Sequence, residues 1–428
     1  MIYVCVQFKK INIVIDNINK INKIALLKKI YMEGFLMKKI LGYFAILLMI
    51  LSLFANCAKK EEQSAPQVEE KIKIGAIFAY TGPASFLGEP EKKTAEMLAE
   101  KINSQGGVLG KKIELIVKDT AGDPQKALNA IKELVQKDGV VAIIGPTTSG
   151  VSLAIKNEMN NMQTPLISCA ASEDIVVPIE ESKWIFKTPQ SDRIAIEKIF
   201  ELIKEKKITK IGLITADKGF GLGGAKQAEK LAPQFNIQIV ANEKFSSEDP
   251  DVNTQITKIK SKKPQAILCW DTDKGSAKVI KSIRTMKLDV PVYMSHGIAN
   301  DGYLMAAGEA GNGVILPCGR LVVLDQLADT HPQKALLKSY SDEYMAKYNE
   351  KPNQFGGYAY DSLMILVEAI KKANSTDKEQ IRSAIEQIKN FSGTAGTYNF
   401  SETDHNGLDK SAFCIVEVKD GKWVLVQE

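Results

Sequence analysis

The chain has 428 residues, of which 45% are hydrophobic and 25% charged, so its composition is globular and its length allows two domains and a leader. The formal net charge of +5 is uneven, because residues 1–56 carry a net +6 and the remaining residues a net −1. A nearly neutral body lacks the basic surface that nucleic acids require, which argues against a nucleic-acid-binding protein.

Residues 37–56 predict an export signal peptide. Met37-Lys38-Lys39 forms a charged head, and about fifteen mostly apolar residues follow it, fewer than the roughly 20 that a membrane-spanning helix needs. The run ends at Ala55-Asn56-Cys57, which resembles the lipobox of bacterial lipoproteins, where the Cys sulfur carries a lipid. We therefore expect a lipid on Cys57, a tether over 57–71, and a periplasmic or extracytoplasmic location on a bacterial membrane. An ordinary membrane anchor, or a cleaved signal with an incidental Cys, is the alternative.

From Ile72 onward, apolar runs alternate with helical patterns in two series. The first series predicts strands at 72–78, 113–117, 140–144 and 165–167. It predicts helices at 91–103, at 124–135 and from 151 onward. The second predicts strands at 208–214, 237–240, 266–269 and 290–294, with helices near 192–205, 221–232, 252–262 and 274–286. Strands separated by helices of this length form parallel sheets with right-handed crossovers. The pattern predicts an α/β fold with two doubly wound, Rossmann-like lobes.

The last part of the chain predicts further helices and a hairpin. The helical patterns cover 332–348, 358–373 and 377–388. Two alternating runs, 413–418 and 423–426, flank Lys419-Asp420-Gly421-Lys422, a sequence typical of a hairpin turn.

Two turns rich in hydroxyl groups follow strands of the first series. Thr147, Thr148 and Ser149 stand between the strand 140–144 and the next helix, and residues 168–172 follow the strand 165–167. The N-terminus of a helix has unpaired N–H groups and a partial positive charge, which favour a carboxylate. Ligands of open α/β sheets bind at such strand ends, so these turns are candidates for an anion site; simple helix capping is the alternative.

The residues offer little for metal or catalytic chemistry. The three His residues are far apart, and there is no Cys-x-x-Cys pair, Gly-x-Ser-x-Gly motif or phosphate loop. Residues 219–224 satisfy G-x-G-x-x-G after a strand and before a helix, so a nucleotide-dependent enzyme is a rival hypothesis. No acidic residue clearly ends the following strand, however, and we expect no enzyme activity, no cofactor and no metal.

The body carries a set of short motifs, namely Thr81-Gly82-Pro83-Ala84, Ile102-Asn103-Ser104-Gln105-Gly106-Gly107-Val108-Leu109-Gly110-Lys111, Asp119-Thr120-Ala121-Gly122-Asp123-Pro124, Ile144-Gly145-Pro146, Ala170-Ala171-Ser172, Asp217-Lys218-Gly219-Phe220-Gly221 and Tyr358-Ala359-Tyr360-Asp361. Together they resemble the Leu/Ile/Val-binding (branched-chain amino acid) family of ABC-transporter substrate-binding proteins, which have the periplasmic binding protein type I fold. The resemblance covers roughly residues 72–428.

This resemblance implies two lobes that close over a small carboxylate ligand and deliver it to an ABC permease. Lobe 1 would comprise residues 72–190 and 318–393, and lobe 2 residues 191–317 and 394–428. Three crossings would join them, near 188–191, 317–321 and 393–397. The implied protein is a monomer whose ligand is a branched-chain or other apolar amino acid. A ligand-sensing receptor with the same fold is an alternative.

The resemblance also implies ligand-binding residues. Ser149 and Ser172 match the hydroxyls that hold the ligand carboxylate, with Thr148 beside the first and Ala170 offering backbone groups. Phe220 matches an aromatic lid from the opposite lobe, and Phe86 or Leu87 an apolar wall.

One departure from the family pattern concerns the ligand amine. Where amino-acid-binding members have an acidic residue after the strand 290–294, this chain has Ser295-His296-Gly297, and a neutral His cannot replace a carboxylate. Asp271 is the nearest substitute by topology. If Asp271 reaches the pocket, an aliphatic amino acid is expected; if not, a carboxylic acid without the amine, stacked on Trp270 or Phe220, fits better. For His296 itself, an exposed loop position is the alternative.

Residues 1–36 are rich in Ile, Asn and Lys, and Met37 is a better start for an export signal. We interpret this segment as an upstream translated extension that is absent from the natural product. The unprocessed precursor is expected to begin at Met37, which N-terminal sequencing or intact mass would reveal. A precursor that begins at Met1 would contradict this interpretation.

Overall fold

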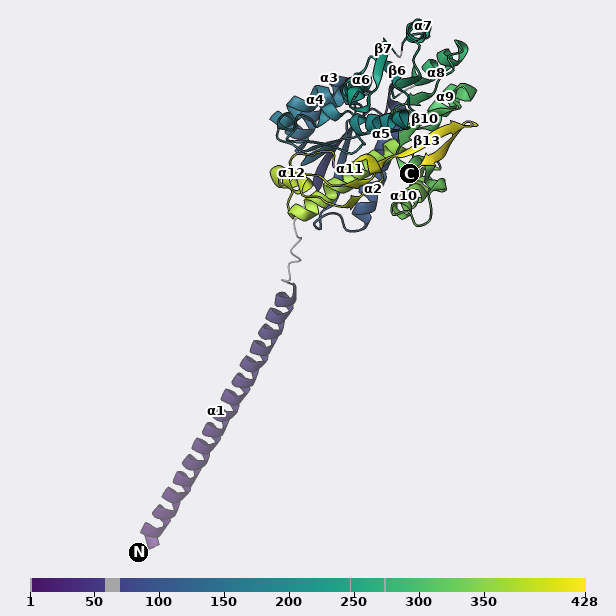
Figure 1. The fold of residues 1–428 in the computed structure, drawn as a ribbon. Coiled ribbons are helices and arrows are strands. Elements are labelled where there is room, and N and C mark those ends of the chain that lie inside the picture. The colour runs from purple at the N-terminus through teal and green to yellow at the C-terminus, as the bar shows by residue number, and fades with distance from the viewer. Residues whose placement is uncertain (1, 58–69, 247, 273–274) are drawn as a thin grey trace. The chain divides into compact units, whose positions relative to one another are not determined.

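The computed structural model describes residues 2–57, 70–246, 248–272 and 275–428, which fall into two units, 1–68 and 69–428 (Figure 1). In the first unit, α1 (Ile2–Cys57) is a single helix that runs through both the predicted extension and the predicted signal peptide. The side chain of Cys57 and the tether residues 58–69 lie outside the described residues. Within the described part of the chain, no helix combines the length and the apolar character needed to cross a membrane.

The second unit contains two large sheets that share one order of five parallel strands, and a small antiparallel sheet of β11 (Phe391–Ser392) and β12 (Thr397–Tyr398). The first sheet has the order β2-β1-β3-β4-β5 and consists of β1 (Ile72–Phe78), β2 (Ile113–Asp119), β3 (Ala142–Ile144), β4 (Leu166–Ser168) and β5 (Ile185–Lys187). All of its pairings are parallel. Side chains alternate between its faces, so Ile74 and Ala76 pack with one set of helices and Ile77 with the other.

Helices cover both faces of this sheet. On one face lie α2 (Ser85–Ser104) and α11 (Gln354–Ala373), which pack against each other, and α12 (Lys378–Glu386) adjoins α11. On the other face lie α3 (Pro124–Lys132), the π-helical turn Glu133–Asp138 and α4 (Ser149–Asn161). The start of α3 is set by Asp123, whose side chain accepts a hydrogen bond from the Lys126 N–H, and by Pro124 at the first helical position.

The second sheet repeats this arrangement and extends it. Its order is β14-β13-β10-β9-β8-β6-β7, with β6 (Lys210–Ala216), β7 (Gln238–Phe245), β8 (Ala266–Trp270), β9 (Val292–Met294), β10 (Val314–Cys318), β13 (Cys414–Lys419) and β14 (Lys422–Gln427). The strands β6 to β10 are parallel, and the hairpin β13–β14 adds antiparallel to β10.

The helices of the second sheet are α5 (Asp192–Glu205) and α6 (Gly219–Leu231) on one face and α7 (Asn253–Ser261), α8 (Gly275–Thr285) and α9 (Asp301–Ala307) on the other. The helix α10 (Lys334–Tyr348) packs its Tyr340 and Tyr344 with the residues of this second group. The Tyr340 hydroxyl lies 2.7 Å from Thr94 Oγ1 on α2, so α10 also contacts α2.

The shared strand order places both topological switch points at comparable positions. In the first sheet the chain reverses its direction of winding between β1 and β3, and in the second between β6 and β8. Open α/β sheets bind ligands outside the carboxyl ends of their strands at such points. The fold therefore identifies the loops after these four strands as the place to look for a site.

The predicted fold class is confirmed, and so is the hairpin at the C-terminus. The strands β5 and β10 were not predicted, because β5 has only three residues and β10 contains Pro317, a residue that is rare inside strands. Both lie next to predicted crossings, where the local pattern resembles a loop.

The segment after the third predicted crossing keeps contacts with the first sheet. Residues 399–407 still bond to the edge strand β5 of the first sheet: the Lys187 N–H donates to the His405 carbonyl at 3.1 Å, and Asn406 Nδ2 donates to the Pro189 carbonyl at 2.9 Å. We therefore propose that the chain crosses at residues 408–413, not near 393–397. The other two proposed crossings follow β5 and β10, and the lobe boundaries stay a prediction.

Asp361 on α11 anchors the loop that precedes this crossing. It is fully buried and accepts hydrogen bonds from the Thr394 N–H (2.6 Å), the Ala395 N–H (2.9 Å) and the Tyr398 hydroxyl (2.8 Å). Burial raises the pKa of Asp361 to about 6, and the accepted bonds offset part of that effect, so the carboxylate is charged at neutral pH.

Asp361→Asn is expected to lower the free energy of unfolding by about 2–4 kcal/mol, because an NH2 group would face N–H and O–H donors. Urea unfolding at neutral pH measures the change. Asp377→Asn is the matched control: Asp377 caps α12 through the Gln380 N–H, and Asn caps helices nearly as well as Asp. Equal losses in the two variants would show that the buried acceptor is unimportant.

Candidate functional site

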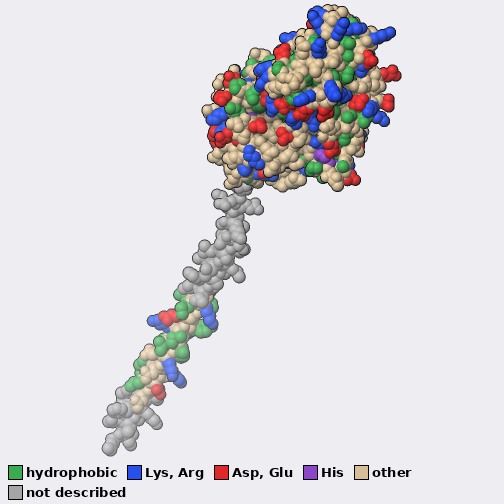
Figure 2. Space-filling model, in the orientation of Figure 1, with side chains coloured by type: hydrophobic (Ala, Val, Ile, Leu, Met, Phe, Trp, Pro, Cys, Tyr) green, Lys and Arg blue, Asp and Glu red, His purple; other side chains and the backbone are tan. Residues whose placement is uncertain are grey.

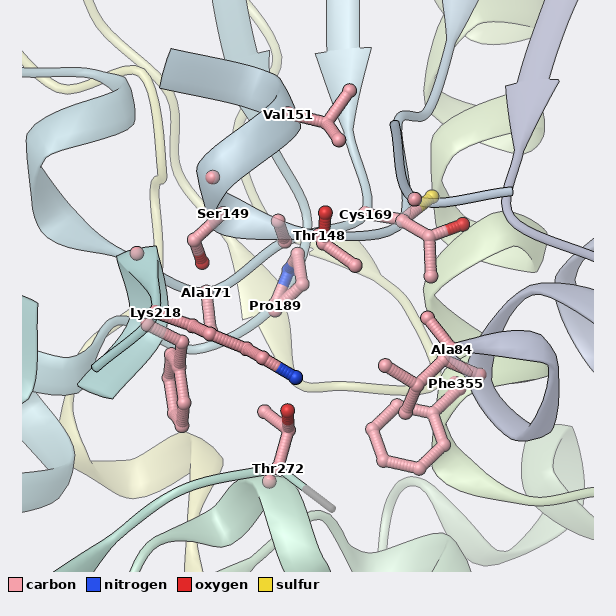
Figure 3. Close-up of a pocket in the computed structure, with 18 of the residues that line it drawn as sticks. Ala84, Thr148, Ser149, Val151, Cys169, Ala171, Pro189, Lys218, Thr272 and Phe355 are labelled. Carbon is pink, nitrogen blue, oxygen red and sulfur yellow. The ribbon is translucent and has the colours of Figure 1, made fainter. Parts of the chain in front are cut away.

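A cavity of about 430 Å³ lies where the carboxyl ends of the two sheets face each other (Figure 3). Its lining comes from the loops after β1, β2, β3, β4 and β5 on one side, from the loops after β6, β8 and β9 on the other, and from the start of α11. The strand order alone predicts this location, because the loops after β1, β3, β6 and β8 flank the two switch points.

The N-terminus of α4 points into this cavity. The Ser152 N–H donates to the Thr148 carbonyl and makes the first hydrogen bond of the helix. The N–H groups of Ser149, Gly150 and Val151 therefore have no partner in the helix. All three residues line the cavity. Ser149 Oγ accepts a hydrogen bond from the Ser172 N–H at 3.2 Å, which leaves its proton free to be donated. This turn can therefore bind an anion.

A buried carboxyl group supports the same turn from behind. Thr147 Oγ1 accepts a hydrogen bond from the Ala79 N–H at 2.9 Å and donates one to Glu91 Oε2 at 2.5 Å. Burial raises the pKa of Glu91 well above its ordinary value, and the bond from Thr147 opposes that shift. Burial therefore favours the uncharged form of Glu91 behind this turn.

The opposite lobe presents a second helix N-terminus and a cation. Lys218 precedes α6, and its side-chain nitrogen extends into the cavity near Thr272 (Figure 3). Gly219, the first residue of α6, touches the start of α4: a Cβ placed on Gly219 would lie 2.7 Å from Gly150 Cα. The two helix ends thus meet backbone to backbone across the cavity.

The remaining walls are apolar and aromatic. Phe86 and Leu87 contribute from the start of α2, Phe355 and Tyr358 from α11, and Phe220 from α6. Phe86 and Phe355 pack edge to face with ring centroids 6.3 Å apart. Such walls suit the hydrophobic part of a small ligand.

His296 completes the wall as a neutral ring. It is 2% exposed, and its imidazole packs edge-on against Phe220 with a centroid distance of 5.4 Å. Burial, followed by the positive charge of Lys187, lowers the pKa of His296 to about 3. The alternative of an exposed loop position is therefore wrong, because the loop after β9 folds against the aromatic cluster.

Six of the predicted ligand-binding residues line the cavity, namely Phe86, Thr148, Ser149, Ala170, Phe220 and His296. The other three, Ser172, Trp270 and Asp271, do not. Ser172 lies behind Ser149. Trp270 is fully buried behind Phe220, with ring centroids 5.6 Å apart.

The side chain of Asp271 is turned toward the start of α8, the next helix in the chain. Its Oδ2 accepts hydrogen bonds from the Ser276 N–H at 3.1 Å and the Ser276 hydroxyl at 3.3 Å, at the start of α8. Among the described lining residues none is acidic, and residues 273 and 274 lie outside the described part of the chain. The described lining residues therefore provide two helix N-termini and Lys218 for binding an anion. They provide no carboxylate for binding a cation.

Sequence reasoning missed Lys218, Thr272 and Phe355. Lys218 and Thr272 follow strands of the second series, so the same strand-end argument that identified Ser149 could have found them. Phe355 had no signal, because a helix far along the chain brings it to the cavity.

Close packing explains the glycine turn at 219–224. A Cβ on Gly224 would lie 2.1 Å from Trp270 Cδ1, and one on Gly221 would lie 2.1 Å from the Ala216 carbonyl oxygen. These glycines let α6 approach β6 and Trp270. The described residues also contain no group of three or more His, Cys, Asp or Glu side chains that could hold a metal ion.

Comparisons with known proteins agree with this geometry. The family model described as periplasmic binding protein matches residues 71–422. A Leu/Ile/Val-binding protein of Rhizobium johnstonii is 24% identical over 85% of this chain and 96% of its own length. A leucine-, isoleucine-, valine-, threonine- and alanine-binding protein of Pseudomonas aeruginosa is 25% identical over 82% of this chain and 91% of its own length.

Solved structures show the same fold. An extracellular ligand-binding receptor from Rhodopseudomonas palustris superposes with a TM-score of 0.78 at 26% identity, covering 83% of this chain and all of that one. The branched-chain amino acid transporter substrate-binding protein LivJ from Streptococcus pneumoniae, solved with isoleucine, has a TM-score of 0.72 at 27% identity and covers 84% of this chain and all of its own.

Gly219→Ala is expected to separate the two helix ends, because its methyl group would collide with the backbone of Gly150. Amide hydrogen exchange at residues 147–151 and 219–222 should become about tenfold faster. Gly150→Ala is the matched control, since its Cβ would lie 3.9 Å from Gly219 N, an ordinary contact. Unchanged exchange in Gly219→Ala would mean that the helix ends are not held together here.

Proposed function

The chain belongs to the periplasmic binding protein family, and we propose that it captures a small apolar carboxylic acid between its two lobes for an ABC importer. Like its relatives, it is a substrate-binding protein and not an enzyme. The observation that carries the proposed ligand class is the convergence of the α4 N-terminus and Lys218 on an otherwise apolar cavity.

The anionic group would bind at the start of α4. The N–H groups of residues 149–151 and the Ser149 hydroxyl can donate to one carboxylate, and the partial positive charge of the helix end favours it. Lys218 would add a full positive charge from lobe 2. The ligand would thereby contact both lobes through its most polar part, and Phe86, Phe220 and Phe355 would enclose its apolar part.

The absence of a described acidic partner favours an acid without an α-amine. Asp271 is engaged at the start of α8, and the neutral His296 ring cannot balance the charge of an ammonium group. A cavity of about 430 Å³ can hold a branched or aromatic side chain. An aromatic or branched-chain acid that carries a keto or hydroxyl group would also give Lys218 an oxygen to bind.

An apolar α-amino acid is the second candidate. It is favoured by the relatives, since one solved structure holds isoleucine and the curated relatives are named for Leu, Ile and Val.

We propose ligand-driven closure as the mechanism. The lobes touch around the cavity at Gly150 and Gly219, and Lys226 on α6 pairs with Asp174 at 2.8 Å. Gln354 Nε2 donates to the His296 carbonyl at 2.7 Å, again from one lobe to the other. A ligand that binds both lobes shifts the equilibrium toward this arrangement. Export through the signal peptide and lipid attachment at Cys57 belong to the same proposal.

A thermal-shift screen with matched ligands tests the ligand class. Isoleucine would be compared with 3-methyl-2-oxopentanoate, and phenylalanine with phenylpyruvate, because each pair differs only at the amine. A ligand at 100 times its dissociation constant adds about 2.7 kcal/mol of stability. We expect the acids without the amine to give the larger shifts. Larger shifts with the amino acids would overturn that choice in favour of the second candidate.

Ser149→Ala and Lys218→Met are each expected to weaken binding of the best ligand at least tenfold, since a hydrogen bond to a charged group contributes about 1.5–3 kcal/mol. Isothermal titration calorimetry measures the affinity. Lys230→Met is the matched control, because Lys230 lies on α6, the helix that follows Lys218, but is exposed and outside the lining. Wild-type affinity in Ser149→Ala would remove the α4 turn from the site.

A further inference from the structure

Two cysteines face each other where the chain passes between the lobes. Cys318 is the last residue of β10 and Cys414 the first residue of β13, and the two are direct partners in the antiparallel ladder. Their sulfur atoms lie 3.8 Å apart, and Cys414 Sγ also lies 3.4 Å from the Cys318 carbonyl oxygen. Both side chains are fully buried.

No other pair of the described cysteines is arranged in this way. Cys169 contacts Ser362 at 3.5 Å, and Cys269 contacts Ser276 at 3.9 Å. Free cysteines in a core usually act as small apolar side chains, and Cys169 and Cys269 fit that description. Cys318 and Cys414 differ because each has a thiol as its neighbour.

The surroundings of the pair favour thiol chemistry. The hydrogen bond from the Cys318 thiol and the positive charge of Arg320 lower the pKa of Cys414, although burial opposes them. Burial raises the pKa of Cys318. One thiol is therefore the better nucleophile and the other its proton donor, as thiol–disulfide exchange requires.

We propose that Cys318 and Cys414 form a disulfide modification site at the hinge, oxidised by a small disulfide or by a thiol–disulfide oxidoreductase. The Cys414 thiolate attacks one sulfur of the oxidant, which forms a mixed disulfide and releases one thiolate. That thiolate takes the Cys318 proton. The Cys318 thiolate then attacks the Cys414 sulfur and releases the second thiolate, which takes up a proton in place of the one that Cys414 lost. Two protein thiols are oxidised, and one disulfide is reduced to two thiols.

The position of the bond gives it a consequence for the hinge. Cys318 directly precedes the second proposed crossing, and Cys414 directly follows the third, at residues 408–413. A disulfide would tie these two crossings together at the ends of two neighbouring strands of the second sheet. The proposed export would also bring the pair into an oxidising compartment, where disulfides persist.

The chemistry can be tested on the full chain, reduced and then incubated with oxidised glutathione. Intact mass should fall by about 2 Da, for two hydrogens lost. Peptide mapping without reduction should find the cross-link between Cys318 and Cys414. Cys318→Ala and Cys414→Ala should each abolish it, and Cys269→Ala, which also removes a buried thiol, should keep it.

Several results would overturn the proposal. One is that both thiols remain open to alkylation once the oxidised sample is unfolded. Another is a stable glutathione adduct on one cysteine of the pair, or a cross-link that joins another pair. As a second readout, the oxidised wild type should melt about 3 °C or more above the reduced form, since the cross-link constrains a long stretch of the unfolded chain. A lower melting temperature on oxidation would show that the hinge cannot accommodate the bond.

Discussion

Two helix N-termini from different lobes meet at one cavity, and this meeting is the constraint around which the molecule is arranged. Each end carries a partial positive charge of about half an elementary charge, and Lys218 adds a full one. An anion that lies between them is stabilised by both ends. In the proposed function the ligand carboxylate supplies this anion, so electrostatics couples ligand binding to the contact between the lobes.

Buried polar groups behind the cavity hold the backbone that lines it. Glu91 accepts a hydrogen bond from Thr147 in the α4 turn, and burial raises the pKa of Glu91 well above its ordinary value. Lys187 is fully buried, and its Nζ donates to the carbonyls of Ala171 and Pro189, two residues of the lining. Burial lowers the pKa of Lys187 to about 8. Hydrogen bonds from buried polar side chains thus hold the backbone around the cavity in place.

The near-neutral surface of the body fits a protein that selects its ligand inside a cavity. On the visible face, Lys and Arg side chains are interspersed with Asp and Glu (Figure 2). A large surface patch of one charge is not needed, because ligand selectivity depends on a few buried hydrogen-bond donors and on aromatic walls. His296 illustrates this: its ring contributes shape and packing, while its low pKa keeps it uncharged.

Local pattern was enough to identify the alternation of strands and helices, the hairpin at the C-terminus and the Ser149 turn, since each depends on residues that are close in sequence. The direction of Asp271 and the burial of His296 were decided by the tertiary structure, in which distant segments meet, such as Gln354 with His296. Phe355 reaches the cavity only because α11 packs on α2. The sequence therefore determined which strand ends could hold an anion. Only the tertiary structure decided which side chains surround it, because long-range packing sets their orientation.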